Sequence, residues 1–259
     1  MPLLSLLLPL VLPGLLSFTG PLTPAGLTPL TELLPLAGIA PLEGRAPASC
    51  NPGGDLVSPA GSLPGAAETL AQGRVHPDRS VRLALFSHVQ EAAEARIERN
   101  PDDLDARWWR VAALGLRIDH ESPRQKVVLA GVVRREAEEI LARDPDHPGG
   151  HHALGRLHSG VLRLNPVLRF LALRFFGEAE LGNATWADAE GHMQRARAAV
   201  PCALIHRYEL SRSFAYQGKQ VEALAELDAL LALPDRAPHD PHVRELAEEL
   251  RAQVARELR

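Results

Sequence analysis

The chain has 259 residues, of which 46% are hydrophobic, 4% aromatic and 23% charged, a length that suits one elongated domain or two small ones. Its 28 basic and 32 acidic residues give a net charge of −4, which argues against a nucleic-acid-binding protein because few phosphates would be neutralised. Two cysteines exclude a disulfide-rich scaffold, and the scarcity of aromatic residues argues against an aromatic-rich β-sandwich.

We expect residues 1–65 to be a disordered leader and linker outside the fold. Residues 1–64 contain only four charged residues but twelve of the 22 prolines, which disfavours regular helix. The apolar run at residues 3–16 has the length of a signal-peptide core but lacks a preceding Lys or Arg, and it is short and interrupted for a membrane span. We expect export, to the periplasm if the organism is bacterial. A lipid anchor at Cys50, a misplaced start codon and a disordered tail on a cytoplasmic protein remain alternatives.

Helical periodicity begins near residue 66, and no alternating apolar run of strand length follows. The first clear helix carries apolar residues at helical spacing: Phe86, Val89, Ala93 and Ile97. It ends at Asn100-Pro101, and a second helix spans about residues 103–118. A capping box at residues 122–125, with Pro123 at the first helical position, opens a third helix that ends at Asp144.

Further helices are expected up to the end of the chain. One contains Leu154, Leu157, Val161 and Leu164, and a short apolar helix follows at residues 166–176. A second capping box, at residues 185–188, opens a helix that ends near Val200. A pair at residues 204–217 and 220–233 turns at Gly218, and a final helix covers about residues 242–258. These patterns predict an all-α domain over residues 66–259.

The helices pair into a divergent repeat. Prolines end the pairs at positions 101, 145, 201 and 234, and only the last interval is close to the 34-residue tetratricopeptide period. The last pair resembles a tetratricopeptide repeat at these positions: Leu210, Phe214, Gly218, Ala223 and Leu227. Trp108 and the Leu154-Gly155 pair fit consensus positions of earlier repeats. We predict an α-solenoid of tetratricopeptide-like hairpins, in which Gly and Ala allow close helix crossing.

The region from about residue 92 to residue 252 resembles the regulator of microtubule dynamics family. The resemblance rests on segments in the family's order: 152–157 (HALGRL), 175–178 (FFGE), 185–198, 208–218, and 230–233 followed by Pro234. It implies an α-solenoid adaptor. It does not imply microtubules as the target, because a chain with a leader and many arginines is also compatible with a bacterial source.

In such solenoids the first helix of each pair lines a concave groove. The repeat phase then places five residues on the groove: Trp109, His152, Arg156, Tyr208 and Arg212. Arg156 and Arg212 occupy the same position in successive repeats, which favours an acidic peptide or a chain-terminal carboxylate. The alternative is that both arginines are solvated or locally paired. The Asn-rich carboxylate clamp of some tetratricopeptide proteins is absent, so chaperone tails are not expected as ligands.

Other candidate sites have simpler interpretations. The histidines form one dense group, at positions 147, 151, 152 and 158, but no carboxylate or Cys lies at ligand spacing, so we expect no metal. Cys202 is expected to be packed, and a disulfide with Cys50, which would require export, is not expected. The basic amphipathic stretch at residues 161–176 is interpreted as a packing insert and not as a membrane-surface helix.

We expect a non-catalytic scaffold that binds a protein or peptide and needs no cofactor, since no nucleophile-elbow, P-loop or dinucleotide motif is present. The alternative is a structural or assembly subunit tethered to a membrane through its leader. A small enzyme or a metal-binding protein is less favoured.

Overall fold

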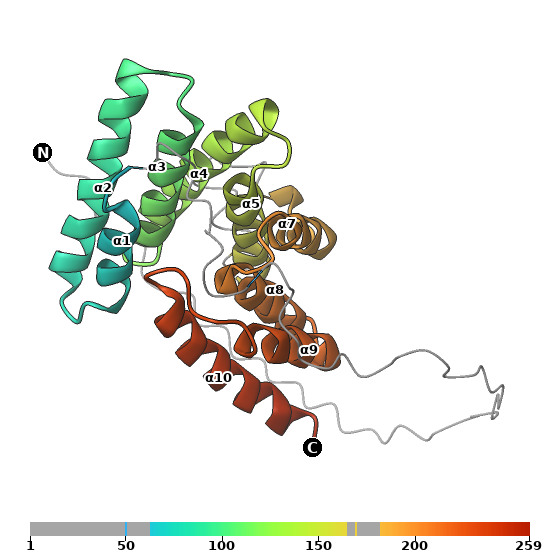
Figure 1. Ribbon diagram of the computed structural model, residues 1–259. Helices are drawn as coiled ribbons and strands as arrows, with labels where there is room; N and C mark the ends of the chain where they lie inside the picture. The colour runs from blue at the N-terminus through green and yellow to red at the C-terminus, as the bar shows by residue number, and fades with distance from the viewer. Residues whose placement is uncertain (1–49, 51–62, 165–168, 170–181) are drawn as a thin grey trace, which may run out of the picture. The chain divides into compact units, whose positions relative to one another are not determined.

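The computed structural model describes Cys50, residues 63–164, Arg169 and residues 182–259. The rest of the leader and, apart from Arg169, the short helix predicted at 166–176 lie outside the described residues. Within them the regular secondary structure is helical, which confirms the all-α prediction (Figure 1). The helices are α1 (Ala66–Val75), α2 (Arg79–Arg99), α3 (Leu104–Ile118), α4 (Pro123–Arg143), α5 (Pro148–Leu162), α7 (Trp186–Ala199), α8 (Leu204–Tyr216), α9 (Gln220–Leu231) and α10 (Asp240–Glu257).

Five of the described helices (α2, α3, α4, α5 and α7) have a side-chain cap at the N-terminus, and three of these caps lie at helix starts that the sequence predicts. The Asp103 carboxylate accepts a hydrogen bond from the Ala106 N–H (2.8 Å), and Thr185 caps α7 in the same way. The Ser122 hydroxyl accepts from Gln125 at the start of α4. These caps satisfy backbone donors that have no partner inside the helix, and they confirm the predicted starts of α3, α4 and α7.

Three elements differ from the prediction. Helix α9 ends at Leu231, two residues before the predicted end at 233. Helix α1 was not resolved from the sequence as a separate helix. Helix α10 begins at Asp240, two residues before the predicted start at 242. The Asp240 carboxylate is buried and accepts hydrogen bonds from the backbone N–H groups of Arg236 and Ala237 (2.8 and 2.7 Å). It therefore fixes the loop that precedes α10.

The helices form two layers. Helices α1, α3, α5, α8 and α10 make up the inner layer, in which each helix contacts the next. Helices α2, α4, α7 and α9 each pack against the inner-layer helices that precede and follow them in the chain. This is the stacking of consecutive helical hairpins that the repeat pattern predicts.

Gly155 lets α5 and α7 cross closely. A Cβ at this position would lie 2.9 Å from Met193 Cγ and 3.1 Å from the Ala189 carbonyl oxygen. Gly218 has a different task, because its φ of 73° in the turn between α8 and α9 suits a residue without a Cβ. Both glycines belong to the segments that carry the sequence resemblances.

The structure contains a disulfide between Cys50 and Cys202, with the two Cα atoms 5.4 Å apart. The expectation that these residues do not pair is therefore wrong. Cys202 precedes α8 and turns inward, and Cys50 joins it in a buried cluster with Leu204, Leu227 and Leu230. Because the Cys50 sulfur is used in the disulfide, it is not available for the lipid anchor considered above.

Candidate functional site

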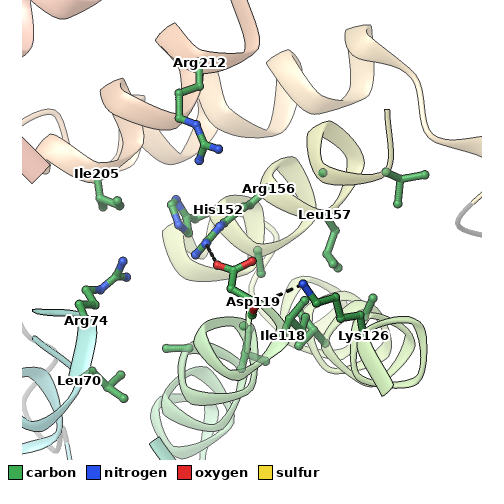
Figure 2. A pocket seen from close by; sticks show the side chains of 18 of the residues that line it. Leu70, Arg74, Ile118, Asp119, Lys126, His152, Arg156, Leu157, Ile205 and Arg212 are labelled. Carbon is green, nitrogen blue, oxygen red and sulfur yellow. Dashed lines mark hydrogen bonds and ion pairs between the residues drawn. The ribbon is translucent and has the colours of Figure 1, made fainter. Parts of the chain in front are cut away.

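A pocket of about 480 Å³ lies along the inner layer. Most of its lining comes from α1, α3, α4, α5 and α8 (Figure 2). The lining residues outside these helices are Asp119, Arg163, Leu164, Arg169 and His239. Four of the five predicted groove residues line it: Trp109, His152, Arg156 and Arg212. Tyr208 is not part of the lining. It packs against the buried cluster that contains Cys202, and the Arg212 guanidinium lies 5.5 Å from its ring centre.

The walls of the pocket are largely apolar. They include Leu70 from α1, Trp108, Trp109 and Ile118 from α3, Leu157 from α5 and Ile205 from α8. Gly149 leaves room for the Trp108 ring, because a Cβ there would lie 2.5 Å from it. Apolar walls with a few placed polar groups are typical of binding pockets.

The charged side chains of the pocket are mainly cationic. Six cations line it: Arg74, Lys126, Arg156, Arg163, Arg169 and Arg212. Asp119 contributes the one carboxylate among the described lining residues. The pocket therefore carries an excess of positive charge beside apolar walls.

Glu209 is the buried counter-ion of this group. Its oxygens lie 3.0 Å from Arg212 Nη1 and 3.5 Å from Arg156 Nε, and Arg156 Nη2 also contacts Asp119 at 3.2 Å. Burial acts to raise the pKa of Glu209, but the positive charges of Arg156 and Arg212 outweigh it and hold the pKa below its ordinary value. Both arginines that the repeat phase singled out are therefore ion-paired within the protein.

Arg74 and Arg163 were missed by the sequence analysis. Arg74 makes no ion pair or hydrogen bond with its side chain in the described part of the chain. Burial, followed by the charge of Arg156, lowers its pKa to about 10, so the guanidinium stays protonated at neutral pH. The Nη1 atom of Arg163 is buried and has no hydrogen-bond partner among the described residues. Neither position was assigned by the repeat phase: α1 was not recognised, and Arg163 caps the end of α5.

Two histidine pairs join α5 to neighbouring helices. His151 Nδ1 lies 2.9 Å from His192 Nδ1 of α7, and His152 Nδ1 lies 3.0 Å from His206 Nδ1 of α8. Burial, followed by the charge of His239, lowers the pKa of His206 to about 4. Burial and the neighbouring His151 lower the pKa of His192 to about 4 as well. The pKa of His152 is also lowered well below its ordinary value by burial and by His206, so the contact between His152 and His206 joins neutral rings at neutral pH.

The described residues contain no group of three or more His, Cys, Asp or Glu side chains arranged to hold a metal ion. None of the described helices is long and apolar enough to cross a membrane.

Fold and pocket together define an all-α protein of stacked helical hairpins with a cationic, apolar-walled pocket on the inner layer. The family model of regulator of microtubule dynamics protein 1-3 matches residues 66–255. The match begins at the first residue of α1 and ends within α10. The chain therefore belongs to the regulator of microtubule dynamics family, as the resemblance indicates. A comparison with curated proteins found no match.

Proposed function

We propose that the protein is a non-catalytic adaptor that binds a segment of a partner protein in the inner-layer pocket. The observation that carries this proposal is the pocket itself, about 480 Å³ in volume, with walls from five helices. Its volume falls in the range of known ligand sites. Helical-repeat proteins commonly use the surface of stacked hairpins to bind partners.

The charge of the pocket favours an acidic partner. Six cations and one carboxylate among the described lining residues give a positive potential that attracts acidic segments and disfavours basic ones. The name of the family refers to regulation of microtubule dynamics, which is a protein-interaction role. We propose such a role for this chain and leave the identity of its partner open.

Photo-crosslinking tests the proposal. A photoreactive amino acid at Leu157, inside the pocket, should cross-link a partner protein in cells of the source organism. The same amino acid at Val221, which is 70% exposed on α9, serves as the control and should not yield that product. Equal yields of the same product from both positions, or none from Leu157, would contradict binding in the pocket.

We also propose that the protein is exported to an oxidising compartment. The disulfide supports this, because such bonds persist in the periplasm and outside cells and are rare in the reducing cytosol. The apolar run at residues 3–16 is the segment that would direct export.

A further inference from the structure

The positive charges around the pocket exceed the negative ones. Four arginines surround Glu209 and influence its ionisation: Arg74, Arg156, Arg163 and Arg212. Against them stand two carboxylates, Glu209 and Asp119. Arg156 contacts both carboxylates and Arg212 contacts Glu209, so these two arginines are paired.

Arg74 and Arg163 provide the part of this excess that lies around Glu209, and Lys126 and Arg169 add further positive charge to the lining. Figure 2 shows Arg74 reaching from α1 into the same space that Arg212 enters from α8. Arg163 lines the pocket from the end of α5, with its buried Nη1 atom unpartnered among the described residues. Its guanidinium also lies over the Tyr216 ring, 5.4 Å from the ring centre. A partly buried guanidinium without a direct ion pair loses solvation that nothing fully replaces, and an anionic ligand would offset that loss.

We infer that Arg74 and Arg163 form the anion-binding subsite of the pocket, and that its ligand is a peptide segment with two carboxylates beside apolar side chains. This inference rests on the proposed function and specifies it. The two arginines match two carboxylates in charge, and a guanidinium binds a carboxylate with two parallel hydrogen bonds. The apolar side chains of the segment would lie against the wall formed by Leu70, Trp109 and Leu157.

Arg156 and Arg212 have a different role in this arrangement. Because both are held by Glu209, which is only 2% exposed, they are positioning residues that keep the floor of the pocket charged and ordered. The acidic-peptide hypothesis assigned binding to these two arginines. Binding of the anionic ligand is instead the role of Arg74 and Arg163.

Fluorescence anisotropy on the full chain tests the inference. The probes are two fluorescein-labelled, C-terminally amidated octapeptides: GSLEELLQ, which has two carboxylates, and its counterpart GSLQQLLQ, which is neutral apart from the dye. We expect the acidic peptide to bind at least tenfold more tightly than the neutral one. Arg74→Gln and Arg163→Gln should each weaken its binding about tenfold, which corresponds to about 1.4 kcal/mol. Arg251→Gln is the matched control, since Arg251 pairs with Asp228 on α9, outside the pocket, and should leave binding unchanged.

The other outcomes separate this inference from the proposed function. Equal binding of the two peptides, or unchanged binding by Arg74→Gln and Arg163→Gln, overturns the subsite while peptide binding stands. If neither peptide binds but Leu157 cross-links a partner, only the inference fails; if Leu157 cross-links nothing either, both fail. Displacement by inorganic phosphate at constant ionic strength, or Arg74-dependent binding of anionic phospholipid vesicles without peptide binding, would overturn the peptide as ligand. A circular dichroism spectrum of each variant checks that it is folded.

Discussion

At the scale of single residues, burial changes the chemistry of side chains that look ordinary in the sequence. Glu209 stands three residues before Arg212, a spacing typical of a solvated helix-surface pair. In the structure it is buried and ionised among arginines from three helices. Removing one partner of such a group leaves an uncompensated buried charge, so the arginines and Glu209 act as a unit.

The buried histidine pair His152–His206 predicts a loss of stability in mild acid. The pKa of His206 is lowered from 6.5 to about 4 by burial and by His239, so the unfolded chain binds more protons between these values. The contribution of neutral His206 to the free energy of unfolding should therefore be at its full value above pH 6.5, and it should fall as the pH drops towards 4. His206 alone should contribute a loss of about 1 kcal/mol between pH 7.5 and 5.5.

Urea unfolding of His206→Gln at pH 7.5 and 5.5 measures this contribution. The variant should lose less stability between the two pH values than the wild type, by about 1 kcal/mol. His88→Gln, at an exposed position on α2, is the control and should follow the wild type. The same pH dependence in His206→Gln and the wild type would show that His206 is not the group that titrates.

Some residues of the site could be predicted from sequence and others could not. Trp109, His152, Arg156 and Arg212 follow from the repeat phase, because one position recurs on successive inner helices. Arg74 lies on a helix that was not recognised, whose only three buried residues leave a weak amphipathic pattern. Its place in the pocket depends on packing between helices distant in sequence, which periodicity does not report.

At the scale of helices, local signals determined most boundaries. Side-chain caps at Asp103, Ser122 and Thr185 mark their helix starts in the sequence and in the structure. Helix α10 lacks such a signal, since no side chain caps it and its first residue, Asp240, instead accepts hydrogen bonds from the preceding loop. The start was therefore predicted two residues late, because it depends on that loop and not on a capping motif.

The crossing of α5 and α7 predicts opposite effects at two glycines of α5. Gly155→Ala places a Cβ within 3.1 Å of a backbone oxygen of α7, and overpacking typically costs about 1–3 kcal/mol. Gly160→Ala meets nothing within 4 Å and should stabilise the helix by about 0.5–1 kcal/mol. The midpoint of urea unfolding should therefore fall for Gly155→Ala and rise for Gly160→Ala. A rise for both would mean that Gly155 is not needed for the close contact.

At the scale of the whole chain, the disulfide links a residue far upstream of α1 to the start of α8. The two cysteines are 152 positions apart, and nothing in their spacing indicates a bond, because pairing depends on the folded positions of both Cβ atoms. Cys50 thus belongs to the buried core although the sequence around it resembles a leader. The fold could be predicted from periodicity and caps, but this long-range bond could not.

The disulfide also makes stability dependent on redox conditions. Closing a loop of 152 residues restricts the unfolded chain by up to about 5 kcal/mol in the chain-entropy model, and measured effects of disulfides are typically about 2–4 kcal/mol. Dithiothreitol should therefore lower the free energy of urea unfolding by about 2–4 kcal/mol, and the double substitution Cys50→Ser/Cys202→Ser should behave like the reduced wild type without responding to dithiothreitol.

Thiol labelling followed by mass spectrometry of protein isolated from its own cells should find no free thiol, since both cysteines are then bonded. Two labelled thiols in that protein, or equal stability of its oxidised and reduced forms, would show that the bond is not part of the native fold and would remove its support for export.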